Sequence, residues 1–142
     1  MRSRVSAAWL VPTLAYVVTL GALGVTSKLA LRTLDWQELV IWTAGAYVIA
    51  ALVILAVGGG GIHLESNTWW AALSALIVVT SLVLLYVALG NGEASKIIPI
   101  TAAYPAVTLI GAALFLSESI STAKVLGMLL VMAGVVVLTV AD

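Results

Sequence analysis

The sequence is poor in residues on which most soluble proteins depend. It has no cysteine, one histidine and one phenylalanine among 142 residues, and only 8% of the chain is charged. A soluble domain carries about 25% charged residues, so this chain has too little polar surface to face water on all sides. Without cysteine, disulfides and thiol chemistry are excluded. The single His63 stands in a glycine-rich loop, which predicts a loop residue and no metal site.

The abundant residues are apolar. Hydrophobic residues make up 63% of the chain and the mean hydropathy is +1.23, which indicates an integral membrane protein. A helix needs about 20 apolar residues to cross the hydrocarbon core. Five segments reach this length: 9–31, 38–57, 69–89, 96–116 and 123–140. The predicted fold class is therefore all-α, with residues 1–142 forming a single domain of five transmembrane helices.

The first of these segments begins after two arginines and could be mistaken for a signal peptide. Its apolar run continues to about Leu31, beyond the roughly 7–15 residues of a signal-peptide core. We therefore expect a retained first span.

The positive charges favour neither orientation in the membrane. An odd number of spans places the two termini on opposite faces. Each face then receives three positive residues: Arg2, Arg4 and Lys124 on one, and Lys28, Arg32 and Lys96 on the other. The positive-inside rule therefore gives no direction. Either deep lysines do not count, or a translocation partner sets the orientation, or the protein inserts both ways and has dual topology.

The fourth span carries its polar residues on one helical face. Thr101, Tyr104, Pro105 and Thr108 follow an i, i+3, i+4, i+7 spacing. Pro105 has no N–H, so the carbonyl of Thr101 loses its helical partner. In lipid such a carbonyl costs several kcal/mol unless another group satisfies it. Pro99 is expected in the first turn, where proline is better tolerated. The span is either a kinked helix within a bundle or, as we predict, the wall of a cavity.

Three residues of the first two spans are further candidates for this cavity. Tyr16 belongs to a polar face of the first span, and Trp42 lies in the second. Lys28 lies about one turn from the end of the first span, where a lysine can snorkel to the interface. It could instead pair with an acid such as Glu38 or Glu93, or hold an anionic substrate group.

Gly127 and Gly134 lie seven residues apart on one face of the nearly apolar fifth span. Small residues on one face let another helix approach closely. The pair predicts a helix–helix interface, either inside the bundle or between chains.

Enzymatic chemistry finds little support in the sequence. It has no Ser/His/Asp set, no paired acids in one span, no phosphate loop and no metal-ligand spacing. No basic patch points to nucleic acid. We expect neither an enzyme nor a bound cofactor or metal.

The stretch "ALGNGEASKIIPITAAYPAVTLIGAALFLSESISTAKVLGMLLVMAGVVVL" resembles the C-terminal part of an EamA repeat, from the drug/metabolite transporter superfamily. The shared features are a glycine before "AS", a proline after it, "YP" in mid-helix, "LFLSE" at the helix end and glycine in the last span. The "SKLAL" of the first span matches more loosely. Family members often carry an arginine early in the second span, whereas this chain has "ELVIWTAGAY".

The resemblance implies a secondary transporter of small molecules or metabolites, a multi-pass protein of the cell (inner or plasma) membrane. Typical members have ten helices in two inverted repeats, whereas this chain resembles one repeat, and Met1 suggests that it stands alone. The resemblance therefore implies an antiparallel homodimer with a central cavity, or a heterodimer with a related repeat. Gly127 and Gly134 also resemble the glycine interface of small multidrug resistance transporters. The alternatives are a non-transporting accessory subunit and a lipid-carrier flippase component.

Overall fold

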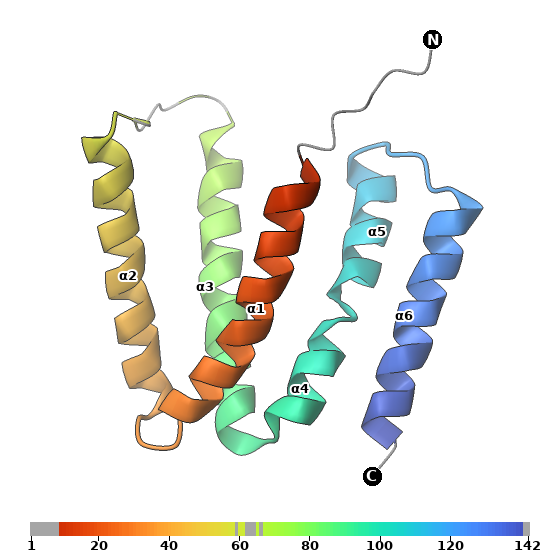
Figure 1. Ribbon diagram of the computed structural model, residues 1–142. Coiled ribbons are helices and arrows are strands. Elements are labelled where there is room, and N and C mark those ends of the chain that lie inside the picture. Colours follow the sequence, from red (N-terminus) through yellow and green to blue (C-terminus); the bar gives the residue numbers. More distant parts are fainter. Residues whose placement is uncertain (1–8, 59, 62–64, 66, 141–142) are drawn as a thin grey trace. The chain divides into compact units, whose positions relative to one another are not determined.

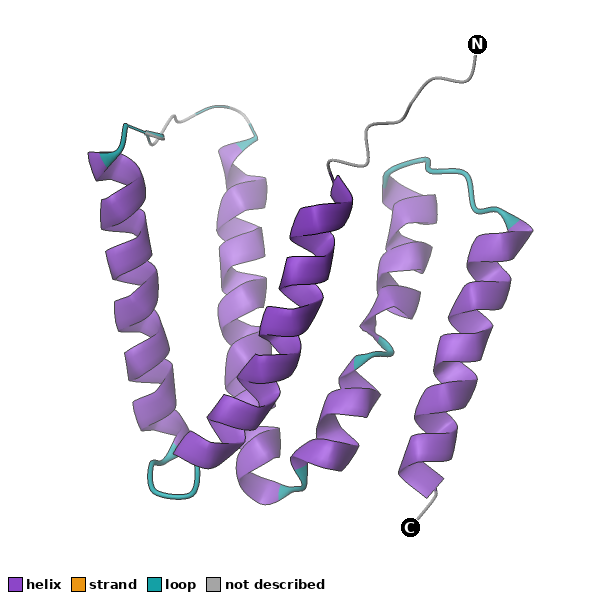
Figure 2. Ribbon diagram, viewed as in Figure 1, coloured by secondary structure: helices purple, strands orange, loops and turns teal. Residues whose placement is uncertain are grey.

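The computed structural model describes residues 9–58, 60–61, 65 and 67–140. Arg2, Arg4 and His63, which entered the predictions above, lie outside these residues. All regular structure within the described residues is helical (Figure 2). The helices, shown in Figure 1, are α1 (Leu10–Ala30), α2 (Trp36–Ala56), α3 (Thr68–Asn91), α4 (Ala94–Thr101), α5 (Tyr104–Phe115) and α6 (Thr122–Val140).

The predicted set of five membrane-spanning helices is confirmed. Among the described residues, five helical stretches are long and apolar enough to cross a membrane, and α4 and α5 together form the fourth of them. Their ends differ from the predicted ends by at most two residues. The apolar runs thus determine the spans, because each is bounded by a short polar or glycine-containing turn.

The chain divides into two compact units, Met1–Asn91 and Gly92–Asp142. In the first unit, α3 contacts both α1 and α2. In the second, α4 contacts α6 (Figure 1). The expectation of one domain over residues 1–142 stays a prediction.

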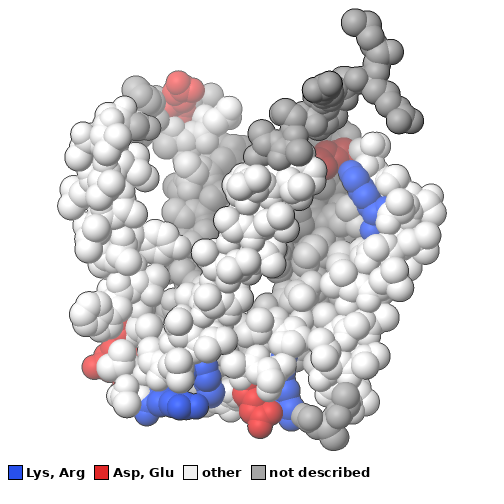
Figure 3. Space-filling view, in the orientation of Figure 1, with Lys and Arg blue, Asp and Glu red and all other residues white. Residues whose placement is uncertain are grey.

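Charged residues lie at the ends of the helices and leave the middle of each helix uncharged (Figure 3). At the start of α2, the backbone N–H of Asp35 donates to Oε2 of Glu38 at 3.1 Å, as in a capping box. At the start of α4, Lys96 Nζ lies 3.5 Å from the carboxylate of Glu93. These two acids, considered above as partners for Lys28, thus contact groups in their own turns.

The turn after α5 depends on one residue in an unusual conformation. Ser117 has φ of 53°, in the left-handed region that costs a residue with a Cβ about 1 kcal/mol. The following N–H, of Glu118, donates to the carbonyl of Ala112 at 3.2 Å. This bond closes the end of α5 and directs the chain towards α6.

Few side chains of the described residues are buried. The buried hydrophobic residues are Tyr86 and Leu89, and the buried polar one is Ser27. Large apolar side chains elsewhere are open, as for Val11 at 73% and Phe115 at 82% exposure. An apolar surface this extensive fits lipid or another protein rather than water.

Candidate functional site

The fourth span is interrupted just before Pro105. Helix α4 ends at Thr101, two residues form a turn, and α5 begins at Tyr104 (Figure 2). Within the turn, the N–H of Ala102 donates to the carbonyl of Pro99 at 3.0 Å, and the N–H of Ala103 donates to the carbonyl of Ile100 at 3.1 Å. Both bonds are of the tighter i to i−3 kind. Because Pro105 has no N–H and its ring would clash with the carbonyl of Thr101 four residues earlier, the sequence explains a break at this point.

The break leaves the last carbonyl of α4 without a helical donor. The last four carbonyls of a helix have no partner within it. In α4, two of them accept the turn bonds above, and the carbonyl of Ile98 accepts the hydroxyl of Thr101 at 2.7 Å. The fourth belongs to Thr101, whose helical donor would be residue 105. Since Pro105 has no N–H, this carbonyl stays open to another donor.

A second carbonyl is released next to it. In a continuous helix the carbonyl of Ala102 would accept the N–H of Ala106. The N–H of Ala106 donates instead to the carbonyl of Ala103 at 3.0 Å. The carbonyls of two consecutive residues, Thr101 and Ala102, thus lose their helical donors within the apolar fourth span.

The structure places the four predicted polar residues of the fourth span around this break. Thr101, Tyr104 and Thr108 are exposed and Pro105 is partly buried. Tyr104 is 53% exposed, and its carbonyl accepts the hydroxyl of Thr108 at 3.4 Å. Pro105 falls in the first turn of α5, where a missing N–H is tolerated. That these residues line a cavity stays a prediction.

The expectation for Pro99 was wrong. Helix α4 begins at Ala94, earlier than predicted, so Pro99 lies inside the helix and not in its first turn. It therefore removes the donor that the carbonyl of Ser95 would use.

Lys28 joins α1 to the end of α3. Its Nζ donates to the carbonyl of Leu89 at 2.6 Å, and Leu89 is fully buried. A cation is favourable there, because the carbonyl end of a helix carries partial negative charge. Lys28 thus has a structural partner; a role for it in the cavity stays a prediction.

A second polar contact joins α2 to α3, and the sequence analysis missed it. The hydroxyls of Thr43 and Tyr86 lie 2.9 Å apart, and Tyr86 is only 2% exposed. Thr43 donates its single proton to the carbonyl of Leu39 at 2.8 Å, so Tyr86 is the donor between the hydroxyls. The available signal was a tyrosine in an otherwise apolar part of the third span, since a buried tyrosine needs a hydrogen-bond partner.

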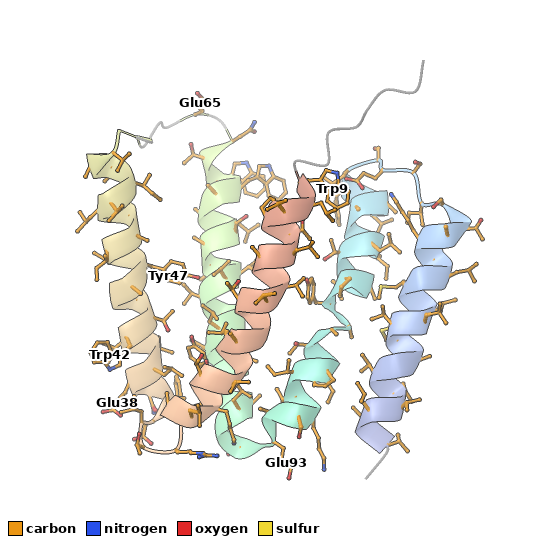
Figure 4. All side chains as sticks on the ribbon, in the orientation of Figure 1. Trp9, Glu38, Trp42, Tyr47, Glu65 and Glu93 are labelled. Atoms are coloured by element: carbon orange, nitrogen blue, oxygen red, sulfur yellow. The ribbon has the colours of Figure 1, made fainter. Side chains whose placement is uncertain are left out.

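The other candidates of the first unit lie on open faces. Tyr16 is 51% and Trp42 72% exposed. Trp42 points away from α3 (Figure 4) and borders a shallow apolar hollow on α2. The hollow is lined by Ile41, Trp42, Gly45, Ala46 and Ile49. The structure therefore does not bring Trp42 to the Lys28 contact of its own unit.

The threonines of the first span satisfy their own helix. Thr13 donates to the carbonyl of Trp9 at 2.7 Å, Thr19 to Ala15 and Thr26 to Ala22. Such bonds occupy the hydroxyl proton, so a threonine stripe does not by itself indicate a polar cavity.

The glycine face of α6 is open among the described residues. A Cβ placed on Gly127 or Gly134 would meet no atom within 4 Å. Within the described part of the second unit nothing packs on that face, so a helix from outside the unit could approach it.

Five apolar spans among the described residues, one interrupted before a proline, define a multi-span α-helical membrane protein. The chain matches the EamA-like transporter family over residues 7–140, and it belongs to that family. It is also 34% identical over 73 residues to an uncharacterized protein of Methanocaldococcus jannaschii. That match covers 51% of this chain and 53% of the relative, so the chain spans about half the length of the curated relative that it matches. No solved structure matches.

The family consists of transporters rather than enzymes. Within the part of the chain that the structure describes, no group of three histidine or acidic residues is placed to hold a metal ion.

Proposed function

We propose that this protein is a secondary transporter of small molecules in the cell membrane, working as an antiparallel dimer of five-helix repeats around a central cavity. The observation that carries the proposal is the break between α4 and α5. A backbone carbonyl that has lost its helical donor is tolerated at membrane depth only where protein satisfies it or where it lines a water-filled cavity. The released carbonyls of Thr101 and Ala102, with the exposed side chains of Thr101 and Tyr104 beside them, support the second case.

The number of spans supports the antiparallel arrangement. Inverted-repeat transporters place the substrate between two repeats of opposite orientation, with interrupted helices at the site. A five-helix unit supplies one of these repeats, and a second copy inserted the other way would supply its inverse. The equal division of positive charge between the two faces supports insertion in both orientations.

Uptake by the purified protein tests the transport proposal. Liposomes holding the protein would be incubated with a mixture of amino acids, sugars, nucleosides, polyamines and organic acids, washed, and analysed by mass spectrometry. We expect at least one solute to enter faster than into protein-free liposomes. Pro105→Ala, which returns an N–H to Thr101, should slow this uptake at least about tenfold, equivalent to about 1.4 kcal/mol. Pro99→Ala, in the same span, should retain it.

Absence of uptake for every solute would contradict the proposal and favour an accessory subunit that acts only with a partner.

The open face of α6 is the proposed contact between the two copies. Gly127→Leu places a branched side chain where another helix would approach closely. We expect the dissociation constant of the dimer in mild detergent, measured by light scattering after gel filtration over a dilution series, to rise at least about tenfold, for a loss of about 1.4 kcal/mol. Leu129→Val on the opposite face of the same helix, with an exposed side chain, is the control and should leave the dissociation constant unchanged. An unchanged Gly127→Leu dimer would place the contact elsewhere.

A further inference from the structure

The break in the fourth span offers hydrogen-bond acceptors but few donors. The N–H groups of Ala102, Ala103 and Ala106 are committed to named carbonyls, and the hydroxyl proton of Thr101 is committed to Ile98. The N–H and the exposed hydroxyl of Tyr104 are the donors that remain beside the break. Pro105 contributes no N–H. Two carbonyl oxygens, those of residues 101 and 102, have lost their helical donors at the same break. The hydroxyl oxygen of Thr101 also keeps its acceptor capacity.

The dipole of helix α4 adds to the negative electrostatic potential of these acceptors. The two carbonyls stand at the C-terminal end of α4, where aligned peptide dipoles give partial negative charge. The opposing end of α5 has a weakened positive field, because Pro105 lies in its first turn without an N–H. An anion would meet carbonyl oxygens here, whereas a cation would be stabilised by them.

We propose that the break between α4 and α5 binds a cationic group, either a small metal cation or the ammonium of a substrate, through the carbonyl oxygens of Thr101 and Ala102. Unwound backbone carbonyls and the ends of half-helices coordinate cations in other transporters. The inference rests on the proposed function for the role of the bound cation, as cargo or as coupling ion. The binding itself requires no transport.

Neutral carbonyls should hold the cation weakly. The ligands proposed here are dipoles, and the acids that the structure describes in the second unit, Glu93 and Glu118, lie in turns outside its helices. Passage through a membrane requires binding favourable enough to admit a solute and weak enough to release it. A dipolar site in the fourth span meets both conditions.

The test measures the thermal stability of the purified protein in detergent. Sodium chloride and ethylammonium chloride would be titrated separately against tetramethylammonium chloride, which has no N–H, at constant chloride concentration. A ligand that binds only the folded protein raises its melting temperature. At about ten times its dissociation constant, the effective cation should raise it by about 5 °C.

Pro105→Ala should abolish this rise, because the restored N–H occupies the carbonyl of Thr101. Pro105→Gly supplies the same N–H with lower helix propensity, and serves if the alanine variant does not fold. Pro99→Ala is the matched control: it restores a bond to Ser95, away from the break, and should keep the full rise. A response to sodium alone identifies a metal site, and a response to ethylammonium alone identifies a substrate ammonium site.

Two results would overturn the proposal: no rise with either cation in the unmodified protein, or equal rises in the unmodified protein and both folded Pro105 variants. Because the measurement is made in detergent, it is independent of the uptake experiment. Cation binding without uptake would reject the proposed function but support the cation site. Uptake without cation binding would support the proposed function but reject the cation site.

Discussion

Tyr86→Ala should lower the free energy of unfolding by about 3 kcal/mol, the usual cost of truncating a buried aromatic side chain. Tyr86 is 2% exposed and provides the hydroxyl that contacts Thr43. In a membrane the loss comes mainly from packing and from the interhelical bond, because lipid is as apolar as the protein interior. The melting temperature in detergent should fall by about 10 °C.

The contribution of the Tyr86 hydroxyl to the free energy of unfolding can be measured separately. Tyr86→Phe should cost about 1 kcal/mol, within the range of interhelical hydrogen bonds in membranes. In a Thr43→Val background the same change should cost little, since its partner is already absent. Tyr47→Phe is the control, because Tyr47 is 55% exposed on α2 and should change stability by less than about 0.5 kcal/mol. Equal losses for Tyr47→Phe and Tyr86→Phe would contradict a specific contact.

Lys28→Met should destabilise the first unit by about 2 kcal/mol. The substitution removes a charged donor 2.6 Å from a carbonyl of a fully buried residue, Leu89, and a buried acceptor left unpaired costs about 1–3 kcal/mol. Thermal unfolding should show a decrease of about 6 °C. Arg32→Met, one turn along the chain and exposed, should leave the melting temperature nearly unchanged.

The same variants distinguish a structural lysine from one that binds substrate. If Lys28→Met keeps the melting temperature but stops uptake of an anionic solute, the contact with Leu89 is not its main role. A lowered melting temperature with uptake retained at low temperature would establish the structural role.

The spans were predictable because membrane crossing imposes a length and a composition on each helix. The break at Pro105 was predictable in part: the missing N–H follows from the residue type, and the freed carbonyl of Thr101 with it. The release of Ala102 was not, because it depends on how the turn redistributes neighbouring N–H groups. Pro99 was misplaced for a related reason, since the start of α4 depends on the turn before it.

Contacts between distant residues were beyond the sequence. The bond from Lys28 to Leu89 joins residues 61 positions apart, and its acceptor is a backbone oxygen that every residue type carries. The pair of Tyr86 and Thr43 requires α2 and α3 to be in register. Apolar spans give no such register, because their polar residues are few and hydrophobicity is almost uniform around each helix.

The distribution of buried residues in the first unit has a mechanical consequence. Ser27, Tyr86 and Leu89 all lie near one end of the three-helix group, where α1 and α2 approach α3, while the opposite ends are exposed (Figure 1). The three helices are therefore held together mainly at one end. Helices α1 and α2, of 21 residues each, are about 30 Å long, since a helix rises 1.5 Å per residue. If one of these helices tilted by about 10° at the packed end, its other end would move by about 5 Å. Two hydrogen bonds and a few buried side chains would act as the pivot.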